Sequence, residues 1–256
     1  MFAWKKRGGP PKQPDEAKQA GQRESGAAAR LPEAEPLLVA SGVERSFDVG
    51  RHKLQVLKGI NLKLYPEQLV MLKGRSGSGK TTLMNLMGGL DVPTKGEIRF
   101  RGQPIHQWDD NRRTALRRKE IGFVFQAYAL LPLLSAYENV ELSLRMAGTP
   151  RSEWKKRITS CLELVGLGKR MHHRPFEMSG GEQQRVAIAK AIAHRPSLLL
   201  ADEPTAELDS QMAAQVMAVF REIVAEEKLS ICMTTHDTTI MEVADHVYEM
   251  ADGVFV

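Results

Sequence analysis

The chain has 256 residues, a formal net charge of +5 and 42% hydrophobic residues, so it is long enough to bury one large core or two small ones. No apolar run approaches the ~18 residues that a membrane helix needs, and the first residues lack the apolar region of a secretory signal. The mild charge does not indicate a nucleic-acid partner, and the two cysteines, Cys161 and Cys232, fall in apolar patterns typical of a core.

The first elements predicted along the chain are a tail and a set of antiparallel strands. Residues 1–36 are rich in Pro, Ala, Gly, Lys and Glu and lack apolar periodicity, which predicts a disordered tail. The folded part then begins near Leu37. The runs 37–47 and 55–65 predict two antiparallel strands, and 96–100 predicts another.

Between the second and third of these runs lies a phosphate-binding pattern. Residues 68–73 predict a short buried strand and residues 81–87 a helix, and the segment between them fits G-x-x-x-x-G-K-[ST] at every fixed position. Glycines let backbone N–H groups turn toward the phosphates of a nucleoside triphosphate, and the helix start adds the positive end of its dipole. We expect Lys80 to reach the β- and γ-phosphates and the Thr81 hydroxyl to bind magnesium. The predicted phosphate-binding residues are Gly74, Arg75, Ser76, Gly77, Ser78, Gly79, Lys80, Thr81 and Thr82.

The middle of the chain predicts a strand followed by helices. The basic run 112–119 is typical of a solvated helix face rather than a DNA contact, because no aromatic side chains interleave it. Residues 121–125 predict a strand that ends at Gln126. Helical spacing then covers three segments, 138–146, 151–165 and 181–194.

The last part of the chain alternates strands and helices. Residues 198–201 and 229–234 predict two apolar strands, and residues 210–227 predict the helix between them. Strands that alternate with helices imply a largely parallel sheet, so the predicted fold is of the α/β class. Such sheets bind ligands at the carboxyl ends of their strands.

Polar side chains stand at these strand ends. Lys80, Asp202 and His236 all follow strands, so we expect them to converge on one ligand. At such a position Asp202 can hold magnesium, directly or through water, and the adjacent Glu203 can polarise the attacking water. Two carboxylates with different roles suit hydrolysis of a phosphoanhydride, and an ordinary acidic pair at a strand end is the alternative interpretation.

Together these motifs resemble the ATPase subunits of ATP-binding cassette (ABC) systems. Residues 178–185 (MSGGEQQR) are similar to the signature motif of that family, and residues 204–209 (PTAELD) to its D-loop. Gln126 corresponds to the Q-loop glutamine and His236 to the switch histidine, and Phe47 stands where the family places an aromatic residue that stacks on adenine. The motifs occur in the order that the family shows, so chance similarity is negligible.

The resemblance implies a fold and a set of roles. It implies one ABC ATPase domain over 37–256, with a phosphate-loop core, an antiparallel β subdomain and a helical signature subdomain over about 127–180. The reaction implied is hydrolysis of ATP with magnesium. The catalytic residues implied are Lys80, Gln126, Glu203 and His236, with Glu203 as general base. The magnesium ligands implied are Thr81, Gln126 and Asp202. The further ATP-binding residues implied are Phe47, Ser179, Gly180, Gly181, Glu182 and Asp209.

The signature motif also points to a dimer. Ser179-Gly180-Gly181 lies at a predicted helix start, which is a second anion-binding terminus in the same chain. In the family this terminus completes the ATP site of a second cassette, head to tail. The resemblance therefore implies a dimer of two copies that share two ATP sites, closed by ATP and released by hydrolysis.

Softer similarities indicate a branch of the family. The segments 125–134, 136–142, 56–60 and 84–91 resemble the macrolide-export and lipoprotein-releasing branch. That branch implies a separate integral membrane permease as partner and a peripheral position at the cytoplasmic face of the cell membrane. The apolar segment after Gln126 is a candidate contact for the permease, with ordinary core packing as the alternative.

Several positions depart from the commonest family pattern. Glu182 stands where many members have glutamine, Met178 replaces leucine, Phe47 replaces tyrosine, and Ala206-Glu207 replaces glycine followed by asparagine or alanine. None removes a catalytic group, so we expect an active ATPase. Two alternatives stay open: an ATPase that transmits mechanical force to a membrane partner without moving solute, and a soluble ABC ATPase of DNA repair or translation.

Overall fold

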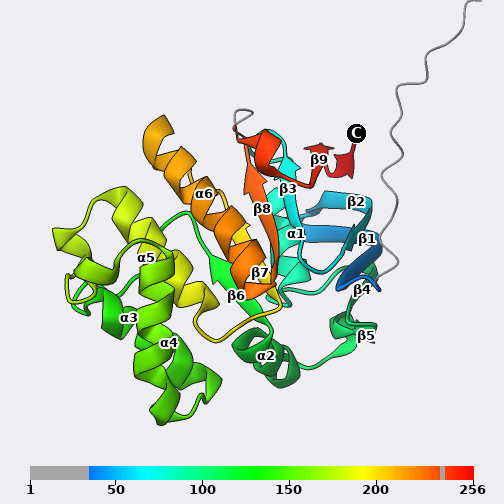
Figure 1. The fold of residues 1–256 in the computed structure, drawn as a ribbon. Helices are drawn as coiled ribbons and strands as arrows, with labels where there is room; N and C mark the ends of the chain where they lie inside the picture. The colour runs from blue at the N-terminus through cyan, green and yellow to red at the C-terminus, as the bar shows by residue number, and fades with distance from the viewer. Residues whose placement is uncertain (1–34, 237–239) are drawn as a thin grey trace, which may run out of the picture. The chain divides into compact units, whose positions relative to one another are not determined.

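Residues 35–236 and 240–256 are described in the computed structural model (Figure 1). The predicted tail, residues 1–36, lies outside these ranges apart from Glu35 and Pro36. Within the described ranges, no helix is both long and apolar enough to cross a membrane. The first strand begins at Leu38, close to the start that the sequence predicts.

One sheet is antiparallel and has the order β2-β1-β4-β5. Its strands are β1 (Leu38–Val49), β2 (His52–Leu64), β4 (Lys95–Phe100) and β5 (Gln103–Pro104). β1 pairs antiparallel with both β2 and β4, which confirms the predicted strands. Gly96 lets β4 approach β1, because a Cβ at this position would lie 2.3 Å from the carbonyl oxygen of Gly42.

The other sheet is largely parallel, as predicted, and has the order β10-β9-β3-β8-β7-β6. Its strands are β3 (Leu69–Lys73), β6 (Ile121–Val124), β7 (Leu198–Asp202), β8 (Ser230–Thr235), β9 (His246–Ala251) and β10 (Val254–Phe255). β10 pairs antiparallel with β9. Neither β9 nor β10 was predicted, because β9 alternates between exposed and partly buried residues and carries charge.

The predicted helices are all present, with small shifts at their ends. The α-helices of the described residues are α1 (Lys80–Met87), α2 (Asp110–Lys119), α3 (Ala136–Ala147), α4 (Arg151–Leu164), α5 (Gly180–Ile192) and α6 (Ser210–Glu227). The basic run lies on α2, but its face is only partly solvated. The side chains of Arg113 and Arg117 are 16% and 19% exposed, because they donate to the carbonyl oxygens of Trp108 and Gly89.

The two faces of the six-stranded sheet enter different hydrophobic clusters. Leu69 and Met71 of β3 belong to the cluster that contains α5 and α6, whereas Val70 and Leu72 belong to the cluster that contains α1 and the antiparallel sheet. Successive strand residues point to opposite faces, so α1 covers one face of the sheet and α5 and α6 cover the other. In Figure 1, α6 crosses in front of the strands.

A buried arginine holds the C-terminal end of α5 against α4 and α6. The guanidinium of Arg157, on α4, donates to the carbonyl oxygens of Ile192 and Ala193 at 2.7 and 2.9 Å. It also donates to both carboxylate oxygens of Glu227, at the end of α6. A cation stabilises the C-terminus of a helix. The planar guanidinium group also matches the two oxygens of a carboxylate. The C-terminal end of α5 is therefore fixed, while its N-terminal end at Ser179 is exposed.

Candidate functional site

The loop between β3 and α1 needs its glycines for two different reasons. Gly77 and Gly79 have φ angles of 80° and 106°, in the left-handed region where a side chain costs energy. Gly74 is needed for space, because a Cβ there would lie 2.3 Å from the backbone oxygen of Met250 on β9. The predicted phosphate loop thus has a backbone path that only glycine can follow.

Lys80 is folded into this loop. Its side chain is 4% exposed, and Nζ donates to the carbonyl oxygens of Gly74 and Arg75 at 2.7 and 3.1 Å. The hydroxyl of Ser78 is buried and has no hydrogen-bond partner within the described residues. The first N–H groups of α1 lack partners inside the helix. A cation, an unpaired hydroxyl and free N–H groups in one cradle fit a polyphosphate.

The residue that lies beside Lys80 and His236 is Glu203, next to the Asp202 that the strand-end prediction named. Glu203 Oε1 is 3.6 Å from Lys80 Nζ, and Glu203 Oε2 is 3.2 Å from Nδ1 of His236. Glu203 has a φ angle of 47°, which is unusual for a residue with a side chain. The structure therefore brings Lys80, Glu203 and His236 together at the carboxyl ends of β3, β7 and β8.

The neighbouring carboxylate is held by a residue that the sequence did not single out. The Thr234 hydroxyl donates to Asp202 Oδ1 at 2.6 Å and accepts from the backbone N–H of Glu203 at 2.9 Å. Thr234 is fully buried on β8, directly opposite Asp202 in the sheet register. A polar residue inside an apolar strand was the only signal for it. Thr234 fixes the carboxylate that is predicted to hold magnesium.

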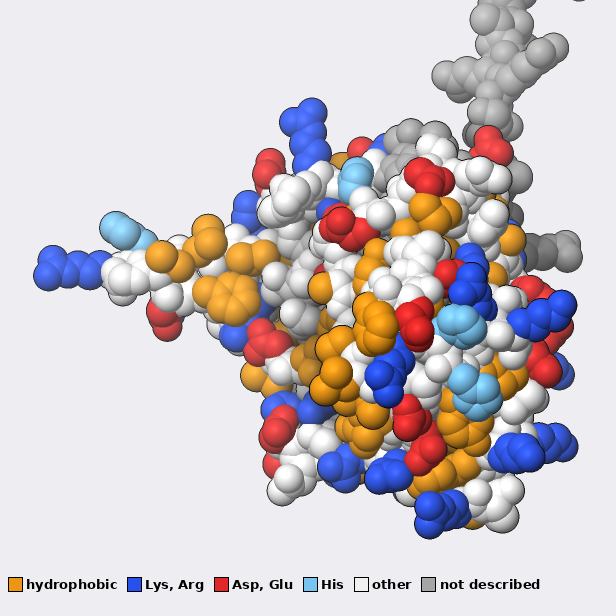
Figure 2. Space-filling model, turned by 90° about the vertical axis from the view of Figure 1, so that its left-hand side faces the viewer, with side chains coloured by type: hydrophobic (Ala, Val, Ile, Leu, Met, Phe, Trp, Pro, Cys, Tyr) orange, Lys and Arg blue, Asp and Glu red, His pale blue; other side chains and the backbone are white. Residues whose placement is uncertain are grey.

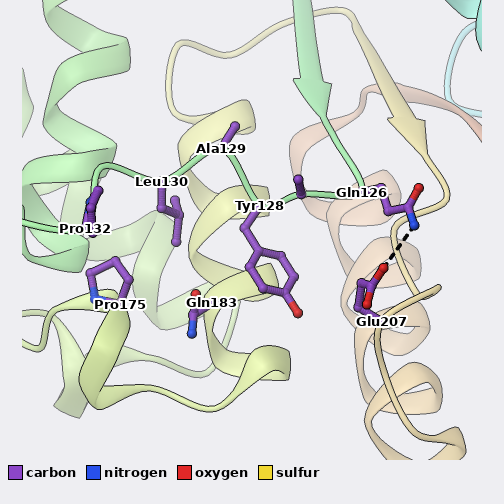
Figure 3. A pocket seen from close by; sticks show the side chains of 9 residues that line it. Gln126, Tyr128, Ala129, Leu130, Pro132, Pro175, Gln183 and Glu207 are labelled. Carbon is purple, nitrogen blue, oxygen red and sulfur yellow. Dashed lines mark hydrogen bonds between the residues drawn. The ribbon is translucent and has the colours of Figure 1, made fainter.

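Gln126 and Glu207 meet at the end of β6. Gln126 Nε2 donates to Glu207 Oε1 at 3.0 Å, as Figure 3 shows. Both residues line an open cavity of about 620 Å³, whose other lining residues are Ala127, Tyr128, Ala129, Leu130, Pro132, Pro175 and Gln183. Glu207 was noted only as a departure from the D-loop pattern, and its contact with Gln126 could not be read from the sequence.

The three oxygen donors predicted for magnesium suit that ion chemically. Thr81 offers a hydroxyl, Asp202 a carboxylate and Gln126 an amide oxygen, and magnesium binds such hard oxygen ligands. In this structure no hydrogen bond or ion pair among the described residues joins the side chains of these three. The three oxygen donors are therefore of the chemical type that magnesium binds.

Tyr128 lies against the start of α5. A Cβ on Gly180 would be 2.9 Å from the Tyr128 hydroxyl oxygen, so the tyrosine side chain would have to shift to make room for it. Burial raises the pKa of Tyr128 above its ordinary value, and the Glu207 carboxylate adds to this rise. The segment after Gln126 is thereby in contact with the signature helix.

The start of α5 is satisfied within its own chain. Ser179 and Glu182 form a capping box: the Ser179 hydroxyl accepts from the Glu182 N–H at 3.3 Å, and Glu182 Oε2 accepts from the Ser179 N–H at 2.9 Å. Arg170 pairs with the same carboxylate at 3.3 Å. Within residues 35–236 and 240–256, no hydrogen bond or ion pair joins Ser179 or Glu182 to the phosphate loop.

The two remaining predicted ATP contacts are Phe47 and Asp209. The Phe47 ring on β1 is 37% exposed, with the Arg45 guanidinium 4.5 Å from its centroid. Arg45 is held there by two hydrogen bonds to Asp91. Asp209 caps α6 by accepting from the backbone N–H of Met212. The structure gives Asp209 a structural role, and its predicted role at ATP stays a prediction.

Comparison with known proteins assigns the family. The sequence model of a family described as ABC transporter matches residues 57–206, which include the phosphate loop, Gln126, the start of α5 and Glu203. The chain belongs to this ABC transporter family. Members of this family are ATPases, and this chain is an ATP-binding subunit, as the resemblance implied.

Relatives of this cassette include proteins of both predicted types. It is 42% identical to the lipoprotein-releasing system ATP-binding protein LolD of Hahella chejuensis, over 86% of this chain and 95% of that protein. It is 44% identical to the macrolide export ATP-binding/permease protein MacB of Wolinella succinogenes, over 85% of this chain. The cassette spans only 34% of that MacB protein.

A solved structure confirms the fold class. An ATP-binding cassette, captured as a dimer in a post-hydrolysis state with ADP and Pi, matches with a TM-score of 0.78 at 36% identity. The match covers 85% of this chain and 96% of that one. The mixed α/β architecture with one antiparallel and one largely parallel sheet is therefore that of an ABC ATPase cassette.

Proposed function

We propose that this cassette is the ATP-hydrolysing subunit of a membrane transport system, and that it works as a head-to-tail dimer with two shared ATP sites. The observation that carries the proposal is the position of two helix starts on opposite faces of one sheet. α1, which follows the phosphate loop, belongs to one hydrophobic cluster, and α5, which begins at Ser179, belongs to the other. The dimeric state of the solved ADP-bound cassette supports the same arrangement.

The sheet keeps these two helix starts apart. The phosphate loop follows β3, whereas α5 packs against β6, and β8 and β7 lie between β3 and β6. Three strand spacings amount to about 14 Å, before the thickness of the sheet is added. Among the described residues no hydrogen bond or ion pair joins Ser179 to the loop, so in this proposal a triphosphate on the loop does not meet Ser179 of its own chain. A second copy, turned head to tail, supplies that helix start.

The residues of one chain then act as follows. Lys80 exchanges the carbonyl oxygens of Gly74 and Arg75 for phosphate oxygens. Glu203 accepts a proton from the attacking water, and His236, already at hydrogen-bond distance from Glu203, keeps that carboxylate in place. Magnesium, when bound, neutralises charge that develops on the phosphates. Its proposed ligands are Thr81, Gln126 and Asp202.

Mixing two inactive variants tests the shared site. Lys80→Ala and Ser179→Arg should each lower ATP hydrolysis by about 10²-fold or more, because each removes stabilisation at the γ-phosphate. An equimolar mixture should recover about a quarter of the wild-type rate, because half of the dimers are mixed and each mixed dimer contains one intact site. Steady-state phosphate release measures this recovery.

A matched mixture provides the control. Lys80 and Glu203 serve the same site from the same chain, so mixing Lys80→Ala with Glu203→Gln leaves a defect in both sites of every dimer. That mixture should recover nothing. Equal recovery in the two mixtures, or full hydrolysis by a monomer of the unmutated chain, would contradict the shared-site proposal.

The proposed partner is a separate permease, which places the cassette at the cytoplasmic face of the membrane. The segment after Gln126 exposes large hydrophobic side chains, among them Leu131 at 46% and Leu133 at 78%. Figure 2 faces the side of the helical elements and shows hydrophobic side chains gathered in groups between basic ones. Exposed apolar groups next to an open cavity are typical of a protein contact. The names of the LolD and MacB relatives support the same assignment.

Membrane recruitment tests this contact. When the cassette is co-expressed with its proposed permease, the chain should be found in the membrane fraction, and Leu133→Glu should release it. Val256→Glu is the matched control, because Val256 is equally exposed at 75% but lies far along the chain from this segment. Both variants should keep the ATPase rate of the purified cassette. Retention of Leu133→Glu in the membrane fraction would exclude this segment as the contact.

A further inference from the structure

The contact between Gln126 and Glu207 joins two segments that lie far apart in the sequence. Gln126 follows the end of β6, and Glu207 lies between β7 and α6. Figure 3 shows the Gln126 amide nitrogen directed at the Glu207 carboxylate and the amide oxygen turned away from it. Both side chains belong to exposed residues, so the bond between them is not forced by close packing.

The chemistry of the carboxylate fixes the orientation of the amide. An ionised carboxylate only accepts hydrogen bonds, whereas an amide has a donating NH₂ end and an accepting oxygen end. Glu207 can therefore hold Gln126 only by its Nε2 end, and Oε1 is the end that stays free. The opposite orientation would place two oxygen acceptors against each other.

Only one end of the amide is useful to magnesium. The ion binds oxygen ligands and does not bind an amide NH₂ group. A glutamine without a partner can turn either end toward the ion, and half of these arrangements are unproductive. A group that holds the other end of a ligand and sets its orientation commonly adds to metal affinity.

We infer that Glu207 is a positioning residue for the metal site: it holds the Gln126 amide so that Oε1 is presented to magnesium. This inference rests on the proposed function, in which Gln126 is a magnesium ligand. It gives a role to one of the departures in the D-loop, where the carboxylate of Glu207 replaces the asparagine or alanine that is commoner in the family. A neutral side chain there cannot enforce one orientation.

The effect of magnesium on ATP affinity tests the inference without hydrolysis. The affinity of the purified chain for a fluorescent, non-hydrolysable ATP analogue is measured with Mg²⁺ and with EDTA. In Glu207→Ala the ratio of the two affinities should fall about threefold to tenfold, as expected when a partner of an exposed metal ligand is lost. The affinity in EDTA should stay within about twofold of the wild-type value, because the phosphate loop is unchanged. A merely structural role of Glu207 would lower both affinities together.

Four further variants distinguish orientation from other effects. Glu207→Lys replaces an acceptor by a donor, so it should hold Oε1 and lower the ratio as far as Gln126→Ala does. Glu207→Gln keeps the size of the side chain but accepts either orientation of the amide, so its ratio should lie between those of the wild type and Glu207→Ala. The double variant Gln126→Ala/Glu207→Ala should match Gln126→Ala alone, because Glu207 acts only through Gln126.

The outcomes separate this inference from the proposed function. A ratio that is unchanged or raised in Glu207→Ala overturns the inference, and a raised ratio would mean that Glu207 withholds Gln126 from the ion. A wild-type chain that binds the analogue but gains nothing from Mg²⁺ also overturns it. A wild-type chain that does not bind the analogue at all overturns the proposed function itself.

Discussion

The starts of α1 and α5 are both glycine-rich helix starts, yet they are prepared for a ligand in opposite ways. The start of α1 has no acidic residue in its first turn. It holds a buried lysine and a serine hydroxyl that has no hydrogen-bond partner among the described residues. The start of α5 has Glu182 in its first turn and is closed by a capping box. One terminus is open to an anion within its own chain, whereas the other is already satisfied.

The capping box at the start of α5 still leaves one donor available. The Ser179 hydroxyl accepts a hydrogen bond from the Glu182 N–H, so its own O–H is still available to donate outward. Arg170 offsets the charge of Glu182. The capping box thus orients a donor without using it up. Under the shared-site proposal, this donor faces the phosphate that a second copy holds.

The largest expected effect concerns Glu203, which lies beside the phosphate loop at the start of α1. Glu203→Gln should lower ATP hydrolysis by about 10²- to 10⁴-fold, because an amide cannot accept the proton of the attacking water. ATP binding should be retained or tightened, because a negative charge 3.6 Å from Lys80 is removed from the phosphate site. Phosphate release and equilibrium binding of ATP measure the two quantities, and light scattering should show a dimer that ATP stabilises.

The control for this variant is the behaviour of His236→Ala. That change removes the imidazole partner of Glu203 but keeps the Glu203 carboxylate. The rate of ATP hydrolysis by His236→Ala should therefore lie between those of the wild type and Glu203→Gln. If Glu203→Gln instead hydrolysed ATP at the wild-type rate, the general base would have to be sought elsewhere. The start of α1 would then bind ATP without providing the base for its hydrolysis.

The parts of the site that could be predicted are those that local sequence determines. The phosphate loop is continuous in sequence, and its glycines and Lys80 fix a backbone path and a charge without help from distant segments. The strand that ends at Asp202-Glu203 was predictable for the same reason, because an apolar run meets two carboxylates. The parallel sheet followed from the alternation of strands and helices.

The parts that could not be predicted depend on long-range register. Thr234 fixes Asp202 only because β8 pairs with β7 in one particular register. Glu207 meets Gln126 only because the segment after β7 folds back past the end of β6. Strand β9 was missed because its apolar residues are interrupted by Glu249, and only Met250 among its six residues is buried. In each case the partner is set by the tertiary fold, and no periodicity in the sequence encodes it.

The smallest expected effect concerns Gly180 at the start of α5, which is compared below with Gly74 in the phosphate loop. In Gly180→Ala the new Cβ would lie 2.9 Å from the Tyr128 hydroxyl oxygen, at the tip of a side chain that is able to move. The free energy of unfolding should fall by about 1 kcal/mol, and thermal or urea unfolding measures this change. Tyr128→Phe in the same chain removes the oxygen and should restore most of the loss. Gly181→Ala is the matched control, because its Cβ would meet the flexible thioether of Met212.

Gly74→Ala is the counterpart on the other face of the sheet. There the Cβ would lie 2.3 Å from the backbone oxygen of Met250, which cannot move aside without displacing β9. ATP binding should therefore be lost in Gly74→Ala and kept in Gly180→Ala, because only the first glycine shapes the cradle that holds the phosphates. Equal loss of ATP binding in both variants would contradict the proposal that the two helix starts of one chain serve different nucleotides.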